Sequence, residues 1–400
     1  MRLTKSFRLL RLLNAQPVWP LRAVCAAGGW LAALVFTRRL TLAGHIARLF
    51  WHEPTLKQPM RMLAWYGARS PLRLEPLADP VFDFARGLRA KERTAVVAFL
   101  NASKRTELQQ HLDDLTLAAD ITTPMAGADF DAVLVRFEKT AAAIFDHLAA
   151  ADPVPPLPPS ESRDGDFAVD DARRALAEFA DLFPNDTVPW YIISGTFLGL
   201  TREGAFLAHD YDIALGVHAA AVGLEAIAAR ATNSANFALV ANDALRLLAR
   251  DADGTVRETA MHILLKLVHR SGVHIDLFVH YLEDGVRWHG SHVHRWDNTE
   301  FALEPHVFEG IKVLAPANAD LYLRENYGDW RTPVSDFSPS TGTPNLTVVH
   351  NLASVVLAIK RYALARKAGD PLSDRLIATL IGAGYAKQTE VEIRLDMRRF

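Results

Sequence analysis

The sequence predicts an α+β fold in which a helical N-terminal region precedes a core built on a mixed sheet. Residues 80–150 show helical patterns with little strand signal. Residues 237–289 contain short segments of alternating apolar residues, as half-buried strands do. Turn-forming dipeptides separate these segments at 253–254, 271–272 and 284–285, which is typical of hairpins.

A change of composition marks the expected domain boundary. Residues 152–164 combine a proline cluster with polar residues, and this composition is typical of a linker. The 400 residues leave room for two or three domains. We therefore expect a basic helical region over 1–150, a Pro-rich linker over 151–165 and a catalytic domain over 166–400.

Cysteine content and overall charge exclude several classes of site. Cys25 is the only cysteine, so neither an intrachain disulfide nor a zinc site built from cysteines can form, and a reducing compartment is expected. The formal net charge of -2 and the pI near 6.7 are ordinary for a globular protein. The basic residues accompany no nucleic-acid-binding motif, so no nucleic-acid partner is expected.

The N-terminal segment is strongly cationic and carries an apolar stretch. Eleven Lys and Arg residues lie within residues 1–70, where Glu53 is the only acidic residue. The apolar stretch at 23–37 is shorter than the roughly 20 residues needed to span a bilayer. Two interpretations remain open: a segment that lies on a membrane surface, and a helical subdomain whose arginines are solvated.

The densest group of acidic candidates is the pair Asp210 and Asp212. Residues i and i+2 of a strand point to the same side, so both carboxylates would reach one hard cation. Mg²⁺ and Mn²⁺ prefer such oxygens and usually keep phosphate and water as further ligands. This pattern predicts a site for phosphoryl or nucleotidyl chemistry.

A glycine turn precedes this pair. An apolar run ending at Ile193 is followed by Ser194, Gly195 and Thr196 and then by a helical pattern. Gly195 would let the backbone approach a phosphate, with help from the turn amides and the two hydroxyls. Two basic side chains, Arg202 and Lys266, are further candidates for donor phosphates.

A third carboxylate comes from later in the chain. Residues 273–279, VHIDLFV, alternate around Asp276, as in a strand that points Asp276 into a site. We expect Asp276 to complete a three-carboxylate metal site with Asp210 and Asp212. The alternatives are an exposed turn or helix cap for the pair and a buried ion pair for Asp276.

The order of these segments resembles a known family. A glycine turn, a Dx[DE] strand and a later strand with one Asp follow each other in nucleotidyltransferases of the DNA-polymerase-β-like fold. Within that fold the chain is similar to the LicD/fukutin family, whose blocks read here SGTFLG, TREGAF, HDYDIALGV and LYLRENYGDWRTP. These blocks cover roughly residues 165–335.

One position departs from the family pattern. Many members have an aspartate where this chain has Ala214. Either the metal site uses Asp210, Asp212 and Asp276, or the chain is a weakened or inactive form.

The resemblance implies an Mg²⁺- or Mn²⁺-dependent transferase. Such an enzyme moves a phospho-alcohol of the phosphocholine, phosphoglycerol or phosphoribitol type from a CDP-linked donor to a hydroxyl of a cell-surface glycan, free or lipid-linked, and releases CMP. With the absence of disulfides, it implies a cytoplasmic protein at the inner membrane face. The alternatives are a non-catalytic module that binds glycan, nucleotide or membrane partners, and nucleotidyl transfer with release of pyrophosphate.

Overall fold

A computed structural model gives the structure of the chain. It describes residue 7 and residues 19–52, 57–67, 88–102, 106–119, 126–150, 168–207, 210, 212–220, 223–334, 337, 339–389 and 392–400. The Pro-rich linker predicted at 151–165 lies outside the described residues, as does most of the segment 1–18.

Contacts divide the chain into two units, neither of which is continuous in sequence. The sheet unit comprises residues 1–16, 159–245 and 260–347, and the helical unit comprises residues 17–158, 246–259 and 348–400. The contacts thus group the last 53 residues with the N-terminal helices, whereas the sequence analysis assigned them to the catalytic region.

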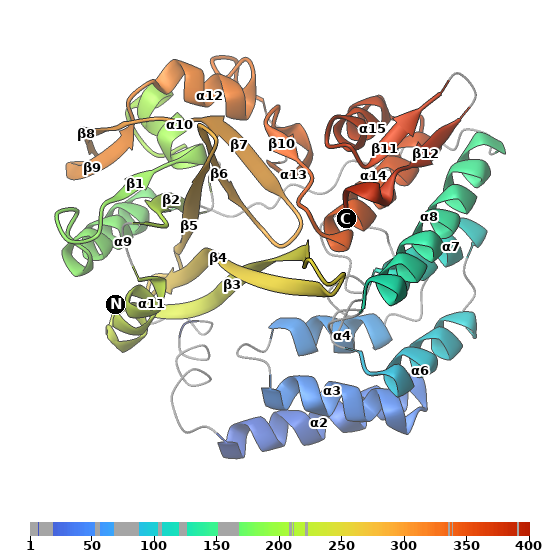
Figure 1. Ribbon diagram of the computed structural model, residues 1–400. Coiled ribbons are helices and arrows are strands. Elements are labelled where there is room, and N and C mark those ends of the chain that lie inside the picture. Colours follow the sequence, from blue (N-terminus) through green and yellow to red (C-terminus); the bar gives the residue numbers. More distant parts are fainter. Residues whose placement is uncertain are drawn as a thin grey trace. The chain divides into compact units, whose positions relative to one another are not determined.

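The helical unit contains two hydrophobic clusters. In the first, α2 and α3 lie side by side (Figure 1), and α4 and α6 pack against them. In the second, α7, α8, α14 and α15 pack with the short strands β11 and β12. The bounds are α2 (Trp19–Thr37), α3 (Leu40–His52), α4 (Lys57–Gly67), α6 (Ala90–Asn101), α7 (Glu107–Ala118), α8 (Gly127–Ala150), α14 (Leu352–Lys367), α15 (Leu372–Gly382), β11 (Ala386–Gln388), β12 (Ile393–Leu395) and η1 (Met397–Arg399).

The sheet unit is built on a ten-stranded mixed sheet. Its strand order is β10-β7-β6-β5-β2-β1-β9-β8, and the β3–β4 hairpin joins it where β4 pairs with β5. The strands are β1 (Trp190–Ile192), β2 (Asp212–His218), β3 (Phe237–Arg250), β4 (Val256–His269), β5 (His274–Glu283), β6 (Val286–Gly290), β7 (Arg295–Thr299), β8 (Leu303–Phe308), β9 (Ile311–Pro316) and β10 (Leu346–Thr347). The α+β class and the helical N-terminal region are therefore confirmed.

Helices cover both faces of this sheet. On one face, α9 (Val169–Leu182) packs against β2, and residues of α9 and of α11 (Leu224–Asn233) share a hydrophobic cluster with Ile213, Leu215 and Val217. On the other face lie α10 (Ser194–Glu203) and α12 (Ala319–Tyr327), where Phe197 contacts Tyr322 and Phe301 contacts Tyr191. The short helix α13 (Pro339–Gly342) precedes β10.

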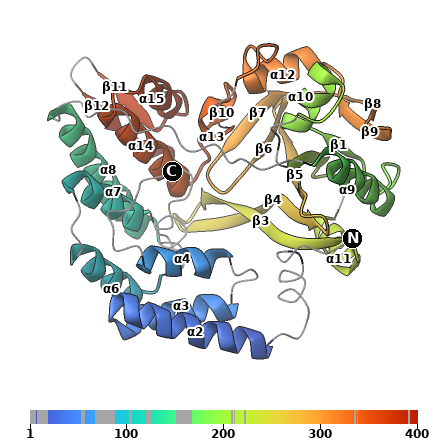
Figure 2. The same cartoon turned by 180° about the vertical axis from the view of Figure 1, so that it is seen from behind.

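The β3–β4 hairpin contributes to both units, and both views show it as a long two-stranded ribbon (Figures 1 and 2). Its tip, residues 246–259, belongs to the helical unit, where Leu248 and Val256 enter the second hydrophobic cluster. Arg250 donates a hydrogen bond to Asp131 on α8 at 2.6 Å. Gly127 lies so close to the tip that a Cβ there would be 2.8 Å from the Gly254 carbonyl oxygen.

Candidate functional site

The three predicted aspartates converge on the sheet face that α10 and α12 cover. Asp212 opens β2, and Asp276 lies on the parallel neighbour β5 opposite Ala214. Paired residues of neighbouring strands share a face, and so do residues i and i+2, so Asp212, Ala214 and Asp276 point to one side. Asp210 precedes β2 rather than sharing its face, and its carboxylate lies against Gly195 of α10.

Electrostatics show that the three carboxylates interact. Burial and, after it, the negative charges of Asp276 and Asp210 raise the pKa of Asp212 to about 8, while the positive charge of Lys266 opposes this rise. Lys266 projects from β4 beside Asp276, where Nζ is 2.5 Å from Asp276 Oδ2. At neutral pH Asp212 therefore keeps its proton in the metal-free protein, because a third negative charge in this buried site costs too much free energy.

The predicted phosphate turn is the first turn of a helix. α10 begins at Ser194, directly after β1, and Ser194 has a φ of 50°, which is unusual for a residue with a side chain. The first N–H groups of a helix have no acceptor inside the helix and form its positive end. Ser194 and Gly195 therefore present amides beside the carboxylate of Asp210.

Thr196 has an additional task that sequence reasoning missed. Its side chain is 1% exposed, and its hydroxyl accepts a hydrogen bond from the Ala214 N–H at 2.9 Å. The Ile193 N–H donates to the Ala214 carbonyl oxygen at 3.1 Å. Thr196 thus links the start of α10 to β2 at Ala214, two residues after Asp212. Ser194 and Gly195 are the more accessible part of the turn.

Arg202 lies apart from the aspartates. It occupies the last turn of α10, about 12 Å along the helix axis from Ser194 at a rise of 1.5 Å per residue. Its guanidinium contacts the neighbouring Glu203 at 3.1 Å. The structure thus brings together Ser194, Gly195, Asp210, Asp212, Asp276 and Lys266, and leaves Arg202 outside this group.

Two glycines one helical turn apart explain the SGTFLG segment. A Cβ on Gly195 would lie 2.8 Å from Asp210 Oδ2, and a Cβ on Gly199 would lie 2.5 Å from the Ala205 carbonyl oxygen. Residues i and i+4 share one side of a helix. The loop after α10 therefore returns along this side and delivers Asp210 to the first turn.

Alanine at either glycine is expected to have a distinct effect. Gly195→Ala should displace the Asp210 carboxylate and lower activity, with little loss of stability because only a side-chain end must move. Gly199→Ala meets backbone and should lower the free energy of unfolding by about 1–3 kcal/mol. Urea unfolding and transferase rates measure the two effects. Gly223→Ala is the matched control, since a Cβ there meets nothing within 4 Å; equal behaviour of all three variants would contradict this packing.

A second polar group on the same sheet face was not predicted. Tyr191 contacts His218 and His280, with ring centroids 5.1 and 5.3 Å away, and His280 contacts His289, with ring centroids 4.5 Å apart. Burial lowers the pKa of His218 to about 4 and that of His289 to about 3. The sequence signalled only an abundance of histidines, because the contacts depend on strand pairing.

Within the described part of the chain, no group of three or more His, Cys, Asp or Glu side chains is arranged to hold a metal ion by itself. The histidine rings of His280 and His289 lie over each other at a tilt of 37°. In the aspartate group, Lys266 Nζ occupies one side of Asp276.

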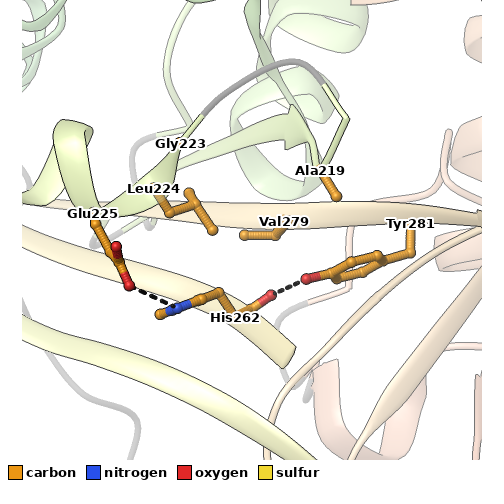
Figure 3. A pocket seen from close by; sticks show the side chains of 7 residues that line it. All are labelled: Ala219, Gly223, Leu224, Glu225, His262, Val279 and Tyr281. Atoms are coloured by element: carbon orange, nitrogen blue, oxygen red, sulfur yellow. Dashed lines mark hydrogen bonds and ion pairs between the residues drawn. The ribbon is translucent and has the colours of Figure 1, made fainter. Parts of the chain in front are cut away.

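A hollow of the sheet unit lies on the face opposite the aspartates. It has a volume of about 280 Å³ and is lined by residues of β4, β5 and the start of α11 (Figure 3). In it, Glu225 Oε1 approaches His262 Nε2 at 3.8 Å, and the Tyr281 hydroxyl donates to the His262 carbonyl oxygen at 2.7 Å. Val279 and Tyr281 lie an odd number of residues from Asp276 on β5, so their side chains point to the opposite face of the sheet. This hollow therefore does not contain the aspartates.

A smaller hollow lies on the aspartate side. Its volume is about 140 Å³, and Phe301, Asn318, Tyr322 and Glu325 are among its lining residues. Tyr322 is buried, which raises its pKa. Its ring contacts Phe197 in the first turn of α10, with ring centroids 5.7 Å apart. This hollow therefore adjoins the first turn of α10.

Comparison with protein families agrees with this arrangement. Residues 187–318 match the family described as LicD/FKTN/FKRP, nucleotidyltransferase domain. These residues form a domain of the LicD/fukutin family. The LicD match covers β1 to β9 with all three aspartates, and it ends before the YGDW segment. This domain indicates a phosphotransferase or glycan-modifying role. No curated protein matches the chain.

Proposed function

We propose that the LicD domain transfers a phospho-alcohol from a CDP-linked donor to a hydroxyl of a cell-surface glycan and releases CMP. The observation that carries this proposal is the convergence of three aspartates at the first turn of α10, where the pKa of Asp212 rises to about 8. In such a site the repulsion between carboxylates favours a bound cation, and the helix amides favour a bound phosphate.

The residues fit a divalent cation that a donor would help to bind. The donor set consists of hard carboxylate oxygens, and the raised pKa of Asp212 reflects repulsion that a cation would relieve. Mg²⁺ commonly takes one or two carboxylates and completes its shell with substrate phosphates and water. Among the described residues, no group of three or more His, Cys, Asp or Glu side chains is arranged to hold an ion alone, which agrees with this mode. Asp210 and Asp212 would hold the ion, with Asp276 as a third ligand or a neighbour.

The chain's own residues would then position the reacting groups. Bound Mg²⁺ or Mn²⁺ would supply positive charge to the donor diphosphate and the departing CMP. The amides of Ser194 and Gly195 would orient a donor phosphate, and Lys266 would hold Asp276 in place. The acceptor oxygen would bond to the β-phosphorus, the bond from that phosphorus to the bridging oxygen would break, and CMP would leave with this oxygen. Asp276 would accept the proton of the acceptor hydroxyl.

Ala214 supports a second candidate, a module that binds donor or glycan without turnover. An aspartate at Ala214 would lie opposite Asp276 in the sheet, whereas this chain has only a methyl group there. Lys266 supplies a positive charge beside Asp276 in the metal-free protein. Affinity for CDP-donors without CMP release would favour this second candidate.

The test is CMP release from a panel of CDP-alcohols with a glycan acceptor, in Mg²⁺ or Mn²⁺ and in EDTA. We expect metal-dependent release by the unaltered chain. Release only by Ala214→Asp would show that the chain is a disabled transferase. Release of pyrophosphate in place of CMP would show nucleotidyl transfer. If neither the unaltered chain nor Ala214→Asp releases CMP from any donor of the panel, the proposed reaction is contradicted.

A further inference from the structure

An apolar stripe runs along the exposed side of α2. Its exposed residues between Pro20 and Val35 contain no charged side chain. Val24, Leu31 and Val35 are 67%, 59% and 58% exposed, and Trp19 at the start of the helix is 65% exposed. At 100° per residue Val24, Leu31 and Val35 share one side of the helix, over about 17 Å of its length. Monomeric proteins rarely expose a continuous apolar patch of this kind without a partner.

The opposite side of α2 is packed against protein. Ala26, Gly29, Ala33 and Thr37 are buried, and a Cβ on Gly29 would lie 2.3 Å from the Phe50 ring of α3. By length and composition α2 is the one helix of the described residues that could cross a membrane, with a mean hydropathy of 1.4. Its small-residue side is nevertheless committed to α3, so only the stripe is free to meet a partner.

A buried ionic group argues against immersion of the helix pair. His45 and Arg48 of α3 contact Glu92 of α6 at 3.1 and 2.8 Å. Burial opposes the ionisation of Glu92, but hydrogen bonds from His45, the Arg89 N–H and Arg48 lower its pKa to about 2. Carrying an ionised group of this kind into hydrocarbon is costly. A partner that contacts α2 from one side only is therefore required.

Charge identifies that partner. Residues 19–52 contain four arginines and no Asp or Glu. Arg22 lies near the start of α2, while the exposed Arg38 and the half-buried Arg39 follow its end. Arg22 also donates to the Trp51 carbonyl oxygen at 2.9 Å, which places a second exposed tryptophan near the first turn. Arginines at both ends of an apolar stripe, with two exposed tryptophans near its first turn, suit the headgroup level of an anionic bilayer.

We propose that the α2 stripe docks on a lipid surface with anionic headgroups, with the helix axis in the plane of that surface. The stripe would enter the boundary between headgroups and acyl chains, while α3 and α6 remain on the water side. This inference does not depend on the proposed transfer reaction, because docking needs neither donor nor metal.

Cosedimentation of the full chain with lipid vesicles tests the proposal. We expect binding to vesicles of phosphatidylcholine and phosphatidylglycerol, and weaker binding to phosphatidylcholine alone. The double variant Val24→Glu/Val35→Glu should bind vesicles at least about tenfold more weakly than the unaltered chain. Arg38→Gln should bind about fivefold more weakly, with less dependence on salt.

The matched control is Val135→Glu on α8, since Val135 is 65% exposed in a helix of the same unit. It should bind vesicles as the unaltered chain does. Circular dichroism checks that each variant is folded, and Leu31→Gln replaces the double variant if that protein does not fold. Absence of vesicle binding, or equal binding by the stripe and control variants, would overturn the proposal. A lipid-free dimer that Val24→Glu/Val35→Glu converts to monomer would assign the stripe to a second copy of the chain.

Discussion

Asp212→Asn is expected to lower the rate of CMP release by about a hundredfold or more, while the folded protein is retained. Asparagine keeps the size of the side chain but removes the charge that would bind the cation. The pKa of Asp212 is raised to about 8 by burial and by Asp276 and Asp210, so the charge is a cost to the metal-free fold. Lost activity and retained stability together would separate a role at the reacting groups from a role in folding.

The sign of the stability effect follows from proton linkage. The folded protein binds a proton at Asp212 up to about pH 8, whereas the unfolded chain releases it near pH 3.8. The free energy of unfolding therefore falls as pH rises from 4 to 8, by up to about 1.4 kcal/mol per pH unit. In EDTA, Asp212→Asn should be more stable than the unaltered chain at pH 8, with a difference that shrinks toward pH 5. Urea unfolding at both pH values measures this.

Two outcomes would count against this account of Asp212. If Asp212→Asn turns over CDP-alcohols at the unaltered rate, Asp212 does not hold the cation. If the variant is less stable at pH 8 in EDTA, the carboxylates do not repel each other as described. Asp210→Asn is a useful companion, because it removes a second negative charge from the loop rather than from β2.

Acidification below pH 6.5 is expected to destabilise the sheet unit through its buried histidines. Burial lowers the pKa of His280 well below its usual value and that of His289 to about 3. These residues are 0% and 4% exposed, so both enter the fold as neutral rings. Because their folded pKa values lie below the unfolded value of 6.5, the stability that they contribute is complete above pH 6.5 and is lost as pH falls toward 3.

The expected slope is about 1.4 kcal/mol per pH unit for each histidine, or about 2.7 for the two. His289→Leu should remove about half of this slope between pH 6 and pH 4.5, measured as the free energy of unfolding in urea. His52→Gln, on the exposed end of α3, is the control and should leave the slope unchanged. Asp212 titrates with the opposite sign over the same range, so the comparison is made between variants. An unchanged slope in His289→Leu would contradict this account.

Local patterns predicted those parts of the site that depend on neighbouring residues. The strand around Asp276 is confirmed, because alternation along 273–279 follows from one buried apolar face and one site face. The start of a helix near Ser194 is confirmed for a similar reason, since an apolar run ends there and a helical period begins. The family assignment also rested on short ordered blocks, and the match over 187–318 bears it out.

Features that depend on pairing between distant segments could not be predicted. Thr196 meets Ala214 only because β1 and β2 pair in one register. Lys266 reaches Asp276 because β4 and β5 pair so that these residues are opposite. The histidine group and the contacts of residues 348–400 within the helical unit also depend on segments that are far apart in the sequence. The hydrophobic pattern of one segment does not say with which distant segment it pairs, or in which register.

The interleaving of the two units has a consequence for covalent continuity. The chain passes from one unit to the other after residues 16, 158, 245, 259 and 347. A single backbone cut would leave every resulting pair of fragments sharing at least one unit. For example, cleavage within 151–157 would yield an N-terminal fragment that contributes Phe7 to the sheet unit and α2 to the helical unit. Such fragments should copurify under native conditions and separate only in denaturant, so a nicked preparation would keep the size of the intact protein.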